Sequence, residues 1–229
     1  MESKQKNAVI IVAGGSGKRM QSTVPKQFLK LNNRTILGLT LERFHRFDST
    51  LQIVVVLPPD QVEYWHSVCL HENITVPHSI TIGGHERFFS VKNGISIVDE
   101  RCRLIAVHDG VRPFISQDLL KRCFDTASEL GNAVPAICPP ETVRFGNFSK
   151  SEILDRNSIF LIQTPQVFLA SQLLEAYQKQ YSPSFTDDAS VVESHGIDIH
   201  MVEGDRSNIK ITSPLDLIIG EALLKNIEF

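Results

Sequence analysis

Residues Ala8 to Leu29, AVIIVAGGSGKRMQSTVPKQFL, carry the most informative pattern in this chain. They open with an unbroken apolar run at 8–12, which predicts a strand buried on both faces of a sheet. Glycines and cations follow this run, namely Gly14, Gly15, Gly17, Lys18, Arg19 and Lys26. Glycine lets backbone N–H groups approach an anion closely, and Lys and Arg add charge-assisted hydrogen bonds. The stretch therefore predicts a loop that holds a polyphosphate at one end of the sheet.

Two common phosphate-binding patterns do not fit this loop. The nucleotide-hydrolase pattern requires Ser or Thr after Gly-Lys, but Arg19 follows Gly17 and Lys18. The dinucleotide pattern GxGxxG fails at its third glycine, where Met20 stands, and this disfavours a dehydrogenase. The spacing that remains, AGGxGxRM followed by PKQFL, resembles the signature of sugar-phosphate nucleotidyltransferases.

Apolar runs and amphipathic stretches alternate along the chain after this loop. Strands are predicted at 53–57, 79–82, 104–107 and 133–138, and helices at 35–44, 61–71, 88–98 and 116–130. This alternation predicts a mainly parallel α/β sheet with helices on both faces, whose ligands bind beyond the carboxyl ends of the strands.

The rhythm breaks at 139–156, where two short strand-like runs flank Gly146 and Asn147 and predict a protruding hairpin. A two-stranded arm is marginally stable alone, so we expect it to pack on a second subunit. Helices are then predicted at 171–181 and at 186–195, with Thr186 as the cap of the second. A last helix begins at Ser213, and we expect Leu215, Ile218, Ile219, Ala222 and Leu223 to pack it against the body.

Composition limits the classes of function. The 229 residues carry a net charge of −3, yet residues 1–30 hold six Lys or Arg and one Glu, which indicates a local anion site and disfavours a nucleic-acid-binding face. The four cysteines form no CxxC motif and are interpreted as reduced thiols, without a zinc site or a disulfide framework. No apolar run is long enough for a signal core or a membrane span, so we expect a cytoplasmic protein.

Five stretches, taken in order, resemble one family closely. They are the glycine loop, GGHER at 83–87 with Ser90, HDGVRP at 108–113, QTPQVF at 163–168, and TDDAS at 186–190 followed by NIKIT at 208–212. Together they resemble the 2-C-methyl-D-erythritol 4-phosphate cytidylyltransferases of the non-mevalonate isoprenoid pathway, nearly end to end. His85 departs from the aspartate of many relatives.

The resemblance implies a single Rossmann-like nucleotidyltransferase domain over 1–229, with 139–156 as a dimerisation arm. It implies a cytoplasmic homodimer that uses Mg²⁺ and transfers the cytidylyl group of CTP to 2-C-methyl-D-erythritol 4-phosphate, releasing pyrophosphate. The catalytic cations would be Lys26, Lys210 and Arg19. The CTP site would comprise Ala13, Gly14, Gly15, Ser16, Gly17, Gly83, Gly84, His85 and Ser90. The sugar-phosphate site would comprise Asp109, Arg112, Thr142, Arg156, Thr164 and Thr186, with Asp109 also a metal ligand beside the CTP phosphates.

Two alternatives remain open at the level of the sequence. Ribitol-5-phosphate cytidylyltransferases share the loop, the HDxVRP stretch and TPQ, and only a few residues, TDDAS among them, favour the methylerythritol enzymes. A non-catalytic nucleotide-binding relative is the other alternative, although the retained cations disfavour it. We interpret His108 as structural, because a phosphate nucleophile needs no general base, and Arg87 as a brace for its loop.

Overall fold

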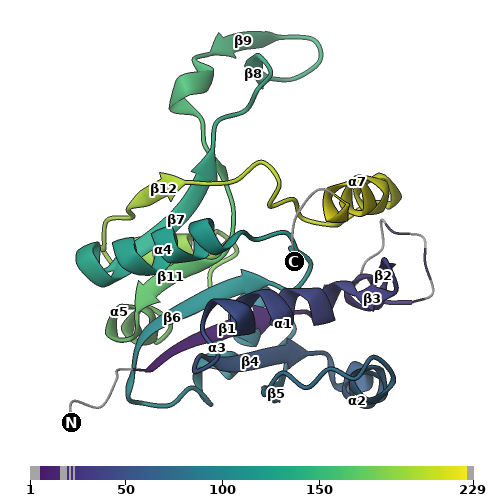
Figure 1. Cartoon of the computed structure of the whole chain (residues 1–229). Coiled ribbons are helices and arrows are strands. Elements are labelled where there is room, and N and C mark those ends of the chain that lie inside the picture. The colour runs from purple at the N-terminus through teal and green to yellow at the C-terminus, as the bar shows by residue number, and fades with distance from the viewer. Residues whose placement is uncertain (1–5, 16–19, 21, 23, 226–229) are drawn as a thin grey trace.

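A computed structural model describes residues 6–225 except 16–19, 21 and 23. In the described residues, a sheet of eight strands forms the centre of the molecule (Figure 1). Its strands are β1 (Lys6–Val12), β4 (Gln52–Leu57), β5 (Ser79–Ile82), β6 (Cys102–Asp109), β7 (Asn132–Ile137), β10 (Leu161–Ile162), β11 (Gln166–Leu169) and β12 (Met201–Glu203). Strands β5, β4, β1 and β6 are parallel, whereas β11 lies antiparallel between β6 and β7. The predicted mainly parallel sheet is confirmed.

Helices cover both faces of this sheet. They are α1 (Ile36–Phe47), α2 (Val62–His71), α3 (Arg87–Ile95), α4 (Gln117–Leu130), α5 (Ala170–Ala176), α6 (Asp188–Ser194) and α7 (Pro214–Leu224). Val9 and Ile11 of β1 pack in the core beneath α1 and α4, while Ala8 and Ile10 pack beneath α3 and α5. Successive side chains of a strand point to opposite faces, so a strand between two helical layers is apolar at every position. This explains the unbroken apolar run of β1.

Capping residues mark the ends of several helices. The Ser116 hydroxyl accepts a hydrogen bond from the Leu119 amide at the start of α4, and Gly131 ends the helix with φ of 96°. Ser213 forms a capping box with Asp216 at the start of α7. The prediction of Thr186 as the cap of α6 is wrong, because Asp187 accepts the Ser190 amide and takes that role.

Three predicted helices differ from their structures. Helix α3 ends at Ile95 although the pattern predicted a helix to residue 98. Helix α5 ends at Ala176 although the pattern predicted a helix to residue 181. On α7, Leu215, Ile218 and Ile219 are 62%, 66% and 42% exposed, so the prediction that they pack the helix down is wrong. Of the other two predicted residues, Leu223 packs against the buried cluster that contains Leu31, Phe114 and Ile211, whereas Ala222 is exposed. The helix also rests on Gly220, where an added Cβ would lie 3.0 Å from the Phe114 ring.

The arm is a hairpin of β8 (Val143–Gly146) and β9 (Ser151–Leu154), which projects from the body beyond β7 (Figure 1). Its apolar side chains Phe145, Phe148 and Ile153 are exposed. A second small ladder, β2 (Lys30–Leu31) with β3 (Arg34–Thr35), precedes α1. Short 3-10 turns lie at Lys26–Phe28, Pro59–Gln61 and Arg156–Ser158.

Two further observations concern the described part of the chain. Its four cysteines are free thiols. None of its helices combines the length and the apolar character that crossing a membrane requires.

Candidate active site

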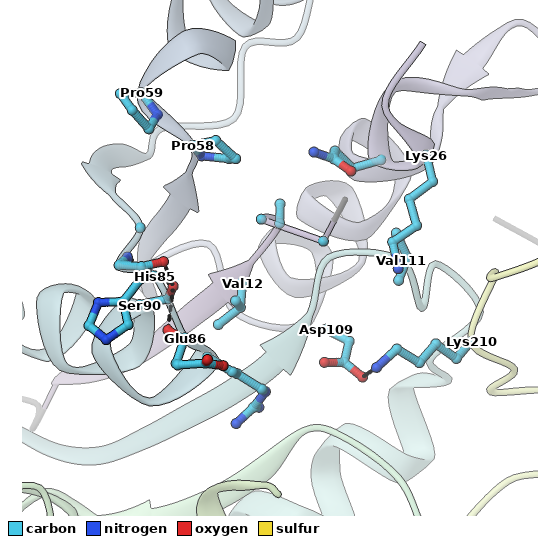
Figure 2. A pocket seen from close by; sticks show the side chains of 17 residues that line it. Val12, Lys26, Pro58, Pro59, His85, Glu86, Ser90, Asp109, Val111 and Lys210 are labelled. Carbon is cyan, nitrogen blue, oxygen red and sulfur yellow. Dashed lines mark hydrogen bonds and ion pairs between the residues drawn. The ribbon is translucent and has the colours of Figure 1, made fainter. Parts of the chain in front are cut away.

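A hollow of about 380 Å³ opens at the carboxyl edge of the parallel strands. The segments after β1, β4, β5 and β6 line it, as expected for a sheet of this topology. Figure 2 shows Lys26, Asp109 and Lys210 on one side of it and the turn of His85 and Glu86 on the other. Its lining residues include Ala13, Gly14, Gly15, Lys26, Pro58, Gly83, Gly84, His85, Ser90, Asp109 and Lys210.

The glycine loop and Lys26 lie directly against each other. An added Cβ at Gly15 would lie 2.9 Å from Lys26 Cε and 3.0 Å from its Nζ, so the amine runs close over the backbone of this glycine. Lys26 begins the 3-10 turn Lys26–Phe28, in which Phe28 is buried and stacks on Trp65 at 6.0 Å. Packing of Phe28 therefore anchors the segment that carries the amine. Ser16, Gly17 and Arg19, which complete the predicted loop, lie outside the described residues.

Lys210 reaches the same hollow from the opposite end of the chain. Its Nζ lies 2.9 Å from Asp109 Oδ2, and Asp109 is the last residue of β6. The neighbouring Ile211 is fully buried and its amide donates to the Val111 carbonyl at 2.9 Å, which fixes the segment beside β6. Cations at both ends of the sequence are thus brought to one place, as Figure 2 shows.

The Gly83–Glu86 turn is held by Ser90 from the first turns of α3. The Ser90 hydroxyl accepts from the Gly84 amide at 3.1 Å and lies 3.1 Å from the Glu86 carbonyl, to which it donates. An added Cβ at Gly84 would lie 2.3 Å from Phe89 Cβ, so only glycine fits this close approach. The His85 ring packs on the Phe89 ring at 4.2 Å.

A second hollow of about 300 Å³ adjoins the first. The two hollows share Arg87, Asp109 and Lys210 as lining residues. The remaining walls of the second hollow include Arg112, Gln163, Thr164, Gln166, Thr186 and Asp187. The expected sugar-phosphate residues Asp109, Arg112, Thr164 and Thr186 therefore lie together, next to the cavity that the glycine turns line.

Arg112 and Thr164 are oriented by contacts that span the chain. Arg112 donates from Nε to Asp109 Oδ2 at 3.3 Å and from Nη1 to the Asn208 carbonyl at 2.7 Å. The Thr164 hydroxyl accepts from the Asp109 amide at 3.1 Å, and the fully buried Asn208 donates to the Thr164 carbonyl at 2.8 Å. The sequence motif that contains Asn208 predicts no role for this residue, because no local pattern identifies a buried asparagine.

Electrostatics favour an ionised Asp109 and a neutral His108 at neutral pH. Burial alone would raise the pKa of the Asp109 carboxyl, but the positive charges of Lys210, Arg87 and Arg112 together lower it below its ordinary value. Burial lowers the pKa of His108 to about 4, so its imidazole is uncharged at neutral pH. The His108 ring contacts Thr164 Oγ1 at 3.2 Å and the Arg112 carbonyl at 3.1 Å, which fits a structural role.

The arm residues lie apart from both hollows. Arg156 is exposed and donates to the Pro140 carbonyl at 2.7 Å, and Thr142 is exposed near the start of β8. Neither Thr142 nor Arg156 lines either of the two hollows of its own chain.

The pair formed by Arg87 and Asp188 was not predicted. Arg87 donates from Nη1 and Nη2 to the two oxygens of the fully buried Asp188, at 2.9 and 2.6 Å. The two residues are 101 positions apart, so no sequence spacing reveals their contact.

Comparison with known proteins gives the family. The family model described as IspD, 2-C-methyl-D-erythritol 4-phosphate cytidylyltransferase, matches residues 7–226. The chain belongs to this family. Among members of the IspD family, a 2-C-methyl-D-erythritol 4-phosphate cytidylyltransferase of Bacteroides fragilis is 48% identical over 215 residues, which cover 94% of this chain and 98% of the relative. A protein of the same name from Clostridium botulinum is 38% identical over 226 residues, covering 97% and 99%.

Solved structures of the IspD family share the fold. The 4-diphosphocytidyl-2C-methyl-D-erythritol synthase of Anaerococcus prevotii superposes with a TM-score of 0.82 at 26% identity, covering 96% of each chain. The 2-C-methyl-D-erythritol 4-phosphate cytidylyltransferase of Thermus thermophilus gives a TM-score of 0.75 at 29% identity, covering 96% of this chain and 98% of that one. These matches extend over almost the whole chain.

Proposed function

We propose that this chain, as a member of the IspD family, transfers the cytidylyl group of CTP to 2-C-methyl-D-erythritol 4-phosphate. The products are 4-diphosphocytidyl-2-C-methyl-D-erythritol and pyrophosphate. One observation carries the proposal: the amines of Lys26 and Lys210 line the same hollow as two glycine turns, beside a second hollow with an arginine fork. Two anionic substrates can meet only where fixed positive charge neutralises them.

The first hollow takes the nucleotide. The backbone amides of Gly14 and Gly15 hold the outer phosphates, and the residues that follow in the sequence, Ser16, Gly17 and Arg19, are proposed to share this role. The Gly83–Glu86 turn with Ser90 receives cytosine and ribose. Since Ser90 is bonded to the turn backbone, its role is to keep the turn in shape. The His85 ring rests on Phe89, so base recognition uses the backbone of this turn.

The second hollow takes the sugar phosphate. Arg112 presents a planar guanidinium to the phosphate, and Asp109, Thr164 and Thr186 contribute oxygens for the hydroxyl groups or for positioning. Asp109 also holds Lys210 in place through its 2.9 Å contact.

The reaction is an in-line displacement at the α-phosphorus of CTP. A phosphate oxygen of the acceptor forms the new P–O bond, and the bond from the α-phosphorus to the α,β-bridging oxygen breaks as pyrophosphate leaves. The acceptor phosphate is already deprotonated at neutral pH, so no side chain must remove a proton. Lys26 and Lys210 stabilise the charge that develops on the α-phosphoryl oxygens, and the shared wall between the hollows aligns the two substrates.

The donor set fits Mg²⁺ carried mainly by the CTP phosphates. Mg²⁺ in nucleotide sites takes one or two carboxylates together with phosphate and water oxygens. Asp109 is a buried anion that lines both hollows, whereas the described residues contain no group of three or more His, Cys, Asp or Glu that could hold a metal. Asp109 would therefore serve as a protein ligand beside the CTP phosphates. When bound, Mg²⁺ neutralises the leaving pyrophosphate.

We propose further that the protein is a cytoplasmic homodimer in which the arm completes the partner's site. The exposed Phe145, Phe148 and Ile153 supply apolar surface for a subunit contact. Thr142 and Arg156, remote from the hollows of their own chain, would then contact the sugar phosphate bound to the other subunit. The four free cysteines fit a reducing compartment.

Initial rates of pyrophosphate release test the proposed reaction. With CTP and Mg²⁺ present, 2-C-methyl-D-erythritol 4-phosphate should support turnover, and ATP or GTP in place of CTP should not. Ribitol 5-phosphate serves as the competing acceptor. Turnover with ribitol 5-phosphate and none with the methylerythritol compound would reassign the substrate, and tight CTP binding without turnover on either would indicate a non-catalytic relative.

A further inference from the structure

We infer that Arg87 and Asp188 form a positioning pair that holds the nucleotide turn in register with the acceptor hollow. The inference rests on the proposed function. In it, neither residue contacts the reacting phosphorus, and both act by positioning other groups. Arg87 is the first residue of α3, directly after the Gly83–Glu86 turn, and Asp188 is the first residue of α6, two positions after Thr186. The pair therefore links one segment from each hollow.

The geometry of the pair is rigid. Both terminal nitrogens of Arg87 donate to Asp188, one to each carboxylate oxygen, at 2.9 and 2.6 Å. Such a fork fixes the relative orientation of two groups as well as their distance, which a single Lys–Asp contact does not. The Asp188 side chain is fully buried and that of Arg87 is 27% exposed, so water competes little for the contact.

Asp188 is itself held from behind. The Tyr177 hydroxyl donates to Asp188 Oδ1 at 2.7 Å, and the Tyr177 ring stacks on Phe88, the neighbour of Arg87, at 4.8 Å. Burial alone would lower the pKa of Arg87, but the neighbouring Asp188 raises it above the ordinary value, so the guanidinium stays charged. The carboxylate cannot turn away without leaving several donors unpaired.

The start of α6 is also tied to the strand beside the acceptor hollow. Gln166 of β11 donates to Asp187 Oδ2 at 2.7 Å and accepts from the Ala189 amide at 2.8 Å. Thr186 precedes this fixed turn and lines the second hollow. Through Arg87, the turn that receives the nucleotide is thus connected to a segment whose own position is set by β11.

The position of Arg87 in the wall that the two hollows share links the Arg87–Asp188 pair to the reaction. Arg87 lines both hollows together with Asp109 and Lys210, so it lies along the line on which the two substrates meet. A displacement of about 1 Å between reacting groups costs about 100-fold in rate. Loosening the pair should therefore lower kcat at saturation of both substrates and leave the affinity for CTP alone nearly unchanged.

Arg87→Lys tests this role because it retains the charge and removes the fork. We expect kcat, measured with both substrates saturating, to fall about 30-fold or more, while the Kd for CTP measured calorimetrically stays within about threefold. Arg101→Lys is the matched control. Arg101 also makes a two-point contact with an aspartate, from Nε and Nη2 to the two carboxylate oxygens of Asp99 at 3.0 and 2.6 Å, and it lies just before the start of β6, at the end of that strand remote from Asp109. The control should keep the wild-type kcat.

A double-variant cycle separates positioning from general weakening. Because both residues act through one contact, Arg87→Lys combined with Asp188→Asn should lower kcat no further than the more damaging single change. If Arg87→Lys does not fold, Tyr177→Phe takes its place, since it retains the ring stack and removes only the donor to Asp188; a lower kcat with unchanged CTP affinity is then expected.

Three results would overturn the inference in a wild-type enzyme that turns over. The first is that kcat of Arg87→Lys, or of its replacement Tyr177→Phe, stays within about threefold of wild type. The second is that the variant loses only affinity for CTP, and the third is that the losses of the two single variants add in the double variant. Absence of turnover in the wild type would instead refute the proposed function.

Discussion

Replacing Lys210 with Met removes one charge from the reacting centre and keeps most of the side-chain volume. A unit charge about 4 Å from a phosphoryl oxygen contributes about 4 kcal/mol at the effective dielectric constant of a protein surface. The Lys210 side chain is 42% exposed, and solvent screening therefore reduces this contribution. We expect kcat to fall about 100-fold, which corresponds to about 2.7 kcal/mol.

The cost to folding should be much smaller. Asp109 loses its 2.9 Å partner but keeps Arg112 at 3.3 Å, so its charge remains compensated. Because the lysine of the pair is 42% exposed and Asp109 retains a second cation, we expect a loss of about 1 kcal/mol, equivalent to a shift of about 2–4 °C in melting temperature for a chain of this size. Activity and stability are thus expected to separate.

The assay is pyrophosphate release at saturating CTP, Mg²⁺ and acceptor, with thermal unfolding measured on the same samples. Lys121→Met is the control, because Lys121 forms an exposed pair with Asp125 on α4, away from both hollows. The reasoning is refuted if Lys210→Met retains more than about one-tenth of wild-type kcat, or if its melting temperature falls by far more than that of a half-exposed pair.

The remaining predictions concern the loops, the subunit contact and pH. Lys26→Ala should abolish most turnover with little loss of stability. If each site is shared between two subunits, mixing this variant with Arg156→Ala should restore about a quarter of wild-type activity. No recovery of activity after subunit exchange would contradict the shared site. Gly84→Ala should raise the KM for CTP at least about tenfold, because the new Cβ lies 2.3 Å from Phe89 Cβ; an unchanged KM would remove the turn from the nucleotide site. His108 has a pKa of about 4 in the folded chain, against 6.5 ordinarily. As the pH falls, the unfolded chain therefore binds a proton at His108 before the folded chain does. The free energy of unfolding should fall by up to about 3 kcal/mol as the pH is lowered from 6.5 to 4. Urea titrations should show a weaker pH dependence in His108→Gln, and equal slopes would contradict this assignment.

Patterns of burial and capping made much of the fold predictable. Strands packed between two helical layers are apolar throughout, and Ser116 and Gly131 mark both ends of α4 because their local chemistry satisfies the helix termini. The cap of α6 was misplaced by one residue, since Thr186 and Asp187 are both good caps and only the bond from Asp187 to Ser190 separates them. Local chemistry does not decide between such neighbours.

Contacts between distant segments could not be predicted from local patterns. The two-point pair of Arg87 and Asp188 joins residues 101 positions apart, and the exposed apolar side chains of α7 follow the helical period of a buried face. For the site, the glycine and cation patterns indicated a phosphate loop, but the presence of Lys210 in the same hollow as Lys26 depends on the hydrogen bond from Ile211 to Val111, just beyond the end of β6. Only the family resemblance assigned Lys210 a role beforehand.

The most direct test of the account is ³¹P NMR of a reaction containing the protein, CTP, Mg²⁺ and 2-C-methyl-D-erythritol 4-phosphate. If the cytidylyl group is transferred, the phosphomonoester signal of the acceptor is replaced by two diphosphate-ester signals, in equal amount to the pyrophosphate released. Pyrophosphate formed together with CMP and an unchanged acceptor signal would show hydrolysis of CTP, and would contradict transfer between the two hollows.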